Sequence, residues 1–209
     1  MRWIVRILVV LAIAWAVYVI SPYYALYDLA RSVDGRDIEA IKARVNFSAV
    51  RISLSRQLVT AYLIATGRES ELKSQNRGLV VAAGGTLAAP LLAEYVSAEA
   101  FADFLAGRKS IGPVSGGGAG GGLAAAVRDN ALGLDSVSAA WKLFMAAETR
   151  GFRVMSFPVP PDKTPDNQFR LVFRLAGFTW RLVGFEVPKA IQDRLVQEML
   201  KREGKPAPG

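Results

Sequence analysis

Two side chains that carry much of enzyme chemistry are missing from this 209-residue chain, which contains neither cysteine nor histidine. Without cysteine the protein has no disulfide and no thiolate nucleophile. Without histidine it lacks the commonest general base and the commonest nitrogen ligand for metals. Catalysis by serine–histidine–aspartate or cysteine–histidine groups is therefore excluded.

Acidic residues are also in deficit. The chain has 18 Asp and Glu against 26 Lys and Arg, which gives a formal net charge of +8. The basic residues are spread along the chain, with no cluster and no recognition motif for nucleic acid. We therefore expect no nucleic-acid partner, and a basic surface held near anionic lipid headgroups accounts for the charge.

The most informative feature that is present is an apolar stretch near the N-terminus. Trp3–Ile20 carries one charge, Arg6, and follows Arg2. A helix of this length, at about 1.5 Å per residue, approaches the thickness of a bilayer core. Basic residues at its start hold that end in the cytoplasm. We expect residues 1–21 to be a transmembrane signal anchor that contacts the lipid bilayer through residues 3–20. The protein would then be single-pass in the inner (plasma) membrane, with its C-terminal domain in the periplasm.

A cleaved signal sequence is the alternative. Ala14-Trp15-Ala16 has the small-x-small pattern of a cleavage site. Against cleavage, the apolar stretch continues to Ile20, and tyrosines suited to a membrane interface follow, at Tyr18, Tyr23, Tyr24 and Tyr27. Retention is favoured, and the sequence leaves cleavage open.

The exported part predicts one α+β domain over residues 22–203. Pro22 suits the first turn of a new helix. Asp37 suits the N-cap of a short helix that ends at Asn46 in a left-handed conformation, and Ser48 suits the cap of the next helix, which Gly67 stops. The glycine-rich segment 112–122 is expected to be a flexible loop, because no Gly-Lys-Ser/Thr follows it to make a phosphate loop. Residues 204–209 are expected to form a disordered tail.

The C-terminal part changes to a period of two. Strands are expected over Phe152–Val159, from Phe169 to Leu175 and over Phe178–Val187, with a tight turn at Ala176-Gly177. Pro188 then opens a final helix. Residues 137–147 fit either an amphipathic helix or an edge strand. The expected fold class is α+β: an N-terminal transmembrane helix, a helical region, a C-terminal antiparallel sheet of three or four strands and a final helix.

Four arginines of the predicted sheet make the candidate binding surface. Arg170 and Arg174 share one strand face by the period of two, and Arg181 extends a basic stripe if it pairs across the hairpin. Arg153 is the fourth. The alternative role of these arginines is solubility and protection of the sheet edge, which we favour over binding. Trp180 is expected in the core.

Catalytic, cofactor-binding and metal-binding residues are not expected. Lys142 is the one lysine in an apolar context, and it needs burial and a partner before it acts as a base. Glu186 points to water, or lines a cavity if the sheet curls. The acidic pairs Asp34/Asp37, Glu69/Glu71 and Asp162/Asp166 lie where carboxylates serve caps, turns and solvated loops.

Three separated stretches resemble one family. They are Ser21-Pro22-Tyr23-Tyr24-Ala25-Leu26, then Arg36-Asp37 followed by Val45-Asn46-Phe47 and Arg51, and finally Gly177-Phe178-Thr179-Trp180-Arg181-Leu182-Val183 running into Val187-Pro188. Together they resemble domain-of-unknown-function family 2939 of Gram-negative bacteria, although Asn46 stands where that family tends to carry aspartate. The resemblance implies a membrane-tethered envelope protein and implies no reaction.

Three functions remain open at this point. The first is a non-enzymatic binding or assembly module facing the periplasm, with a possible envelope protein partner. The second is a binder of lipid or a small molecule, which predicts an apolar pocket between sheet and helices, rimmed by arginines. The third, of low weight, is a hydrolase of unknown substrate.

Overall fold

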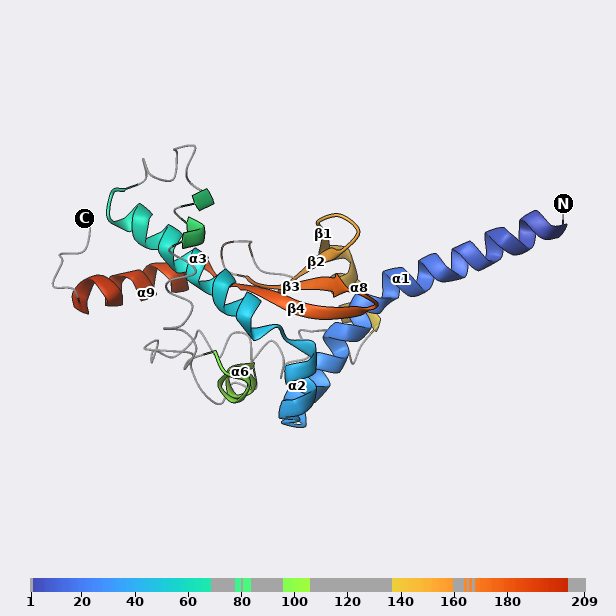
Figure 1. Ribbon diagram of the computed structural model, residues 1–209, viewed down its shortest axis with the longest axis horizontal. Coiled ribbons are helices and arrows are strands. Elements are labelled where there is room, and N and C mark those ends of the chain that lie inside the picture. Colours follow the sequence, from blue (N-terminus) through green and yellow to red (C-terminus); the bar gives the residue numbers. More distant parts are fainter. Residues whose placement is uncertain are drawn as a thin grey trace.

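The computed structural model describes residues 2–68, 78–79, 81–83, 96–105, 137–159, 164, 166 and 168–202. Within them lie a long apolar helix, a helical region, a four-stranded antiparallel sheet and a final helix, which confirms the expected α+β class. Figure 1 shows α1 projecting from one end of the molecule and α9 lying at the opposite end. The glycine-rich segment 112–122, the tail 204–209, Glu69, Glu71 and Asp162 fall outside the described residues.

The first helix, α1 (Arg2–Asp34), is continuous over 33 residues, so the expectation of a new helix at Pro22 is wrong. Proline has no N–H and leaves the carbonyl four residues earlier without its usual donor. That carbonyl belongs to Tyr18, and the Ser21 hydroxyl donates to it at 2.8 Å. The helix therefore runs through the proline, and the boundary expected between residues 21 and 22 lies inside one element.

The two halves of α1 have opposite surroundings. Residues 2–17 are all exposed, and an 18-residue window with a mean hydropathy of 2.5 has no buried residue. By length and composition, α1 is long and apolar enough to cross a membrane, as a membrane anchor or a signal sequence does. Beyond this exposed half, Leu26, Leu29 and Val33 are buried in the core of the domain.

The next two helices begin at side-chain caps. Asp37 caps α2 (Ile38–Arg44) as predicted, because its Oδ1 accepts the Ala40 N–H at 2.9 Å. The cap of α3 (Phe47–Ala65) is Asn46 and not Ser48, since Asn46 Oδ1 accepts the Ala49 N–H at 3.0 Å. Asn46 has a φ of −89°, so it is not the left-handed end of the preceding helix. As predicted, α3 stops before Gly67, whose φ is 71°.

Two further helices pack against the sheet. Ser97 starts α6 (Ala98–Leu105), with its Oγ accepting the Ala100 N–H at 3.1 Å. Residues Val137–Ala146 form α8, which settles the helix-or-strand alternative in favour of a helix. Leu143 of α8 is buried and Lys142 beside it is exposed, as expected of an amphipathic helix.

The sheet is an antiparallel meander in the order β1-β2-β3-β4. Its strands are β1 (Glu148–Thr149), β2 (Val154–Val159), β3 (Phe169–Ala176) and β4 (Thr179–Glu186), followed by α9 (Lys189–Arg202). Strand β2 starts two residues later than predicted, because Phe152 lies in the preceding turn. The turn between β3 and β4 has two residues, Gly177 with a φ of 64° and Phe178, the pattern of a type II′ hairpin.

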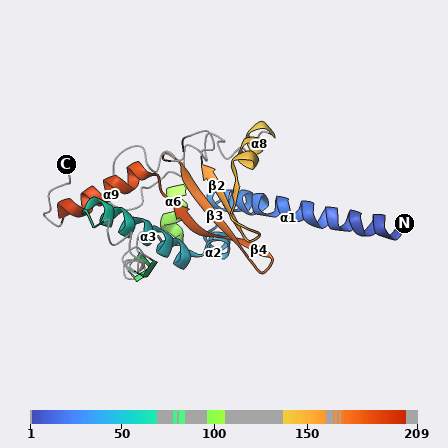
Figure 2. The same cartoon turned by 90° about the horizontal axis from the view of Figure 1, so that it is seen from above.

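The core lies between one face of the sheet and helices α1, α2, α3 and α6, which all contribute buried side chains to one cluster. Aromatic rings bridge these layers: Tyr23 of α1 contacts Phe157 with ring centroids 5.2 Å apart, and Phe101 of α6 contacts Phe185 at 6.3 Å. Trp180 is buried, as predicted. Figure 2 shows α8 and α3 on opposite sides of the sheet. Each fully buried phenylalanine contributes about 1.5–3 kcal/mol because its apolar surface is removed from water. The packing of Tyr23 on Phe157 is one contact through which this face holds α1 to the domain.

A candidate anion-binding cleft

The free edge of β4 is covered by α3, and this contact builds one wall of a cleft. Val45 forms a parallel bridge with Leu182 of β4, and the Asn46 N–H donates to the Leu182 carbonyl at 2.8 Å. A bare edge strand exposes backbone groups that can pair with another chain. The start of α3 therefore protects this edge and holds the helix beside it.

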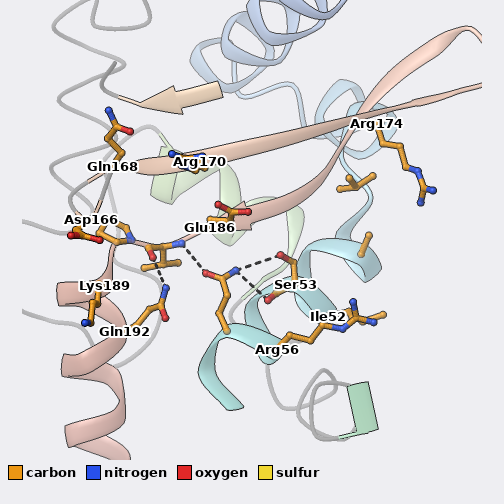
Figure 3. A pocket seen from close by; sticks show the side chains of 15 residues that line it. Ile52, Ser53, Arg56, Asp166, Gln168, Arg170, Arg174, Glu186, Lys189 and Gln192 are labelled. Carbon is orange, nitrogen blue, oxygen red and sulfur yellow. Dashed lines mark hydrogen bonds between the residues drawn. The ribbon is translucent and has the colours of Figure 1, made fainter. Parts of the chain in front are cut away.

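Further along α3, one glutamine binds the end of β4. Gln57 Nε2 donates to the Phe185 carbonyl at 2.8 Å, and its Oε1 accepts the Val187 N–H at 2.9 Å. The Val187 carbonyl in turn accepts from Gln192 Nε2 of α9 at 2.6 Å. Figure 3 shows the bond from Gln192 as a dashed line. Together these hydrogen bonds fix α3, the end of β4 and the start of α9 relative to one another.

A β-bulge decides which side chains of β4 face the cleft. Val172 pairs with Gly184 and Phe173 pairs with Leu182, so Val183 is an extra residue on β4. Strict alternation would place Glu186 on the same face as Leu182, in the core. The extra residue reverses the alternation, so Phe185 is buried and Glu186 is not.

The cleft has a volume of about 700 Å³ and lies between α3, the outer face of β3 and β4, and the start of α9 (Figure 3). From α3 it is lined by Ala49, Ile52, Ser53, Arg56 and Gln57. From the sheet come Arg170, Arg174, Val183 and Glu186, and the remaining lining residues are Asp166, Gln168, Val187, Pro188, Lys189 and Gln192. The walls thus combine apolar and charged side chains.

The cleft carries more positive than negative charge. Its basic side chains are four and its acidic side chains two, which leaves a net charge of +2. Two of the charged groups have partners outside the cleft. Arg170 Nη1 lies 2.6 Å from Glu148 Oε2, and Glu186 Oε1 lies 3.4 Å from Arg150 Nη1. These ion pairs hold Arg170 and Glu186 against the rim of the sheet.

Arg56 and Arg174 differ from Arg170 and Glu186 in their interactions. Neither forms a hydrogen bond or an ion pair with any residue in the described part of the chain. Figure 3 shows Arg174 on the sheet and Arg56 on the helix, on opposite walls of the cleft. A guanidinium presents fixed donors that match a carboxylate or phosphate group. The arrangement can therefore hold an anion between two walls.

The four arginines of the predicted surface are only partly brought together. Arg170 and Arg174 line the cleft. Arg181 is the register partner of Arg174 across the hairpin, as the basic stripe required, but it does not line the cleft. Arg153 is exposed before β2 and also lies outside the lining. Arg56 was not anticipated, because no signal in the helix sequence says which strand the helix packs against.

The other residues considered from the sequence are dispersed. Lys142 is exposed on α8 and does not line the cleft. Glu186 lines it, as the curled-sheet alternative required, and so does Asp166. Asp37 serves the cap of α2. Within the described ranges, no three aspartates or glutamates gather where they could hold a metal ion.

Comparison with known proteins finds one family. Residues 11–104 match the family described as protein of unknown function (DUF2939). Neither the curated proteins nor the solved structures include a match to this chain. The matched residues contain the Ser21-Pro22-Tyr23 and Val45-Asn46-Phe47 motifs, and the tryptophan hairpin lies beyond them. The resemblance is confirmed as a match to this family over residues 11–104, which cover α1 from residue 11 onward, α2, α3 and all but the last residue of α6.

Proposed function

We propose that this protein is a non-enzymatic binding module of the cell envelope, tethered to the membrane by α1, that holds a small anionic ligand in the cleft. The observation that carries the proposal is the pair of guanidinium groups, Arg56 and Arg174, that face one cleft from two walls without a carboxylate partner among the described residues. Both side chains are exposed, so their guanidinium donors are accessible to a ligand that carries a carboxylate or phosphate group.

The apolar lining indicates what else the ligand carries. Ile52, Val183 and Pro188 lie among the charged residues. A molecule with one carboxylate or phosphate group and a short apolar part fits both kinds of contact. The cleft is more polar than the apolar pocket expected for a lipid, so an acyl chain is the less favoured ligand.

The two environments of α1 support the proposed tether. Its first half is apolar and exposed, and its second half is built into the core. The helix is unbroken through Ala14-Trp15-Ala16, the alternative cleavage site. These features support a retained single-pass anchor with Arg2 and Arg6 in the cytoplasm and the domain in the periplasm.

The ligand proposal is tested by native mass spectrometry of the detergent-extracted protein. We expect a bound anion in the wild type and its loss in the double variant Arg56→Gln/Arg174→Gln. Arg181→Gln is the matched control, because it removes the neighbouring arginine outside the cleft. A wild type without any bound anion, or equal retention in the double variant and the control, would contradict the proposal.

The tether is tested separately by a C-terminal fusion to a reporter enzyme that is active only outside the cytoplasm. We expect an active fusion in the membrane fraction, and a polypeptide whose N-terminal sequence still includes Arg2 and Arg6. A silent fusion would exclude the periplasmic orientation. A mature chain that begins at Val17 would exclude the retained anchor.

A further inference from the structure

We propose that the two hairpin ends beside α1 form a membrane-contact edge, in which Phe152 and Phe178 enter the headgroup region of the bilayer that α1 crosses. This inference rests on the proposed tether, and it adds a second contact between domain and membrane. Its occupant is the surface of an anionic bilayer.

The first observation is the exposure of the two phenylalanines. Phe152 is 88% exposed and Phe178 is 104% exposed. Both occupy turns, where small and polar residues are usual. Scattered apolar residues on a surface need no explanation, but these two occupy equivalent positions, each in a hairpin turn.

The second observation is that both turns lie at the same end of the sheet. In an antiparallel meander the β1–β2 and β3–β4 connections lie at one end, and the β2–β3 connection lies at the other. Figures 1 and 2 show that the β3–β4 hairpin ends beside α1, on the side from which the helix projects. The two phenylalanines therefore share one edge of the domain.

The third observation fixes this edge at the end of the expected span. The Tyr18 hydroxyl donates to the Phe152 carbonyl, and the Tyr18 ring lies 6.4 Å from the ring of Trp180, two residues after Phe178. Tyr18 belongs to the last turn of the stretch expected to span the membrane, which ends at Ile20. Both turns are thus held at the depth where α1 leaves the bilayer.

The charges around the edge match anionic headgroups. Arg153 and Arg181 are exposed and lie within three residues of Phe152 or Phe178. Arginine near a membrane surface is attracted by anionic lipids, and aromatic side chains settle at the boundary between headgroups and acyl chains. The combination favours an anionic bilayer over an apolar protein surface.

The absence of cysteine makes a direct test possible, because a single introduced cysteine is the only site that a thiol-specific label can modify. The full chain carries Phe152→Cys or Phe178→Cys, labelled with a nitroxide, in vesicles of phosphatidylethanolamine and phosphatidylglycerol. Electron paramagnetic resonance then compares accessibility to oxygen, which dissolves in lipid, with accessibility to a water-soluble nickel chelate. Ile13→Cys in the exposed half of α1 and Glu39→Cys on α2 are the reference positions.

We expect the ratio of oxygen to nickel accessibility to be highest at residue 13 and several-fold higher at residues 152 and 178 than at residue 39. A ratio at 152 and 178 equal to that at 39, with residue 13 still in lipid, would overturn the membrane-contact edge alone. A water-like ratio at residue 13 would overturn the tether as well. In vesicles of phosphatidylcholine only, we expect a lower ratio at 152 and 178, and an unchanged ratio would overturn the role of the arginines.

Discussion

Trp180 Nε1 donates a hydrogen bond to Ser21 Oγ at 2.7 Å, and so joins the last hairpin to the middle of α1. The same hydroxyl donates to the Tyr18 carbonyl that Pro22 leaves without a backbone donor. The Ser21 hydroxyl therefore replaces the missing backbone donor in the helix and also binds the sheet through Trp180. The Ser-Pro-Tyr motif and the tryptophan hairpin, 159 residues apart between Ser21 and Trp180, form one junction between α1 and the sheet.

Ser21→Ala is expected to lower the free energy of unfolding of the domain by about 1–3 kcal/mol, because the buried Trp180 N–H and the Tyr18 carbonyl both lose their partner. Urea titration of the detergent-solubilised protein, followed by tryptophan fluorescence, measures the change. Ser48→Ala is the matched control, since Ser48 is exposed at the start of α3 and forms no hydrogen bond within the described residues. Equal stability of the two variants would contradict the role of Ser21.

A double-mutant cycle separates the two functions of Ser21. Pro22→Ala restores a backbone N–H that can bond the Tyr18 carbonyl. In that background Ser21→Ala removes only the bond from Trp180, so it should cost about 1 kcal/mol less than in the wild-type sequence. The same urea titration measures all four proteins. Strict additivity would show that the Ser21 hydroxyl does not replace the missing donor.

The cap of α3 predicts opposite outcomes for two substitutions of Asn46. Asn46→Ala should destabilise the protein by about 0.5–2 kcal/mol, because the Ala49 N–H loses its acceptor. Asn46→Asp keeps an acceptor and places a negative charge at the positive end of the helix, which is worth about 0.3–1 kcal/mol. Thermal unfolding followed by circular dichroism compares them. A melting temperature of Asn46→Asp as low as that of Asn46→Ala would contradict the cap.

Gln57 joins α3 to the end of β4 through both atoms of its amide. Gln57→Ala should reduce stability by about 1–3 kcal/mol, because the Phe185 carbonyl and the Val187 N–H are left without these partners. Hydrogen exchange offers a local measurement: the Val187 amide should lose protection, whereas amides in the middle of β3 keep theirs. Gln197→Ala, at an exposed position of α9, is the control and should leave both quantities unchanged.

Gly184 lies next to the bulge at Val183, where α3 packs on the sheet. A Cβ there would lie 3.2 Å from the Val172 Cβ and 3.3 Å from the Ser53 Oγ. Gly184→Ala should therefore cost about 1–3 kcal/mol through overpacking. A Cβ on Gly78 meets no atom within 4 Å, so Gly78→Ala is the control and should cost nothing. The urea concentrations at the unfolding midpoints of the two variants measure these costs. Equal midpoints would exclude a tight contact at Gly184.

Patterns that depend on neighbouring residues were read correctly from the sequence. The apolar length of Trp3–Ile20, the cap at Asp37 and the alternation of β3 are local, since each depends on contacts within a few residues. The helix through Pro22 and the cap at Asn46 were not. In both cases a contact with a strand more than 100 residues away in the chain accompanies the local hydrogen bond, between Ser21 and Trp180 and between Val45 and Leu182, and the neighbouring sequence does not reveal that contact.

The candidate site also combines features that are set by the local sequence with features that are set by tertiary packing. The sequence by itself determined that α1 is long and apolar enough to cross a membrane, that the C-terminal strands alternate, and that Arg170 and Arg174 share a face. Only the tertiary structure decided that Arg56 opposes Arg174, that Arg153 and Arg181 stay outside the cleft, and that the bulge at Val183 turns Glu186 outward. The physical reason is that a period within one element fixes which side chains share a face, whereas the packing of α3 on β4 fixes what that face meets.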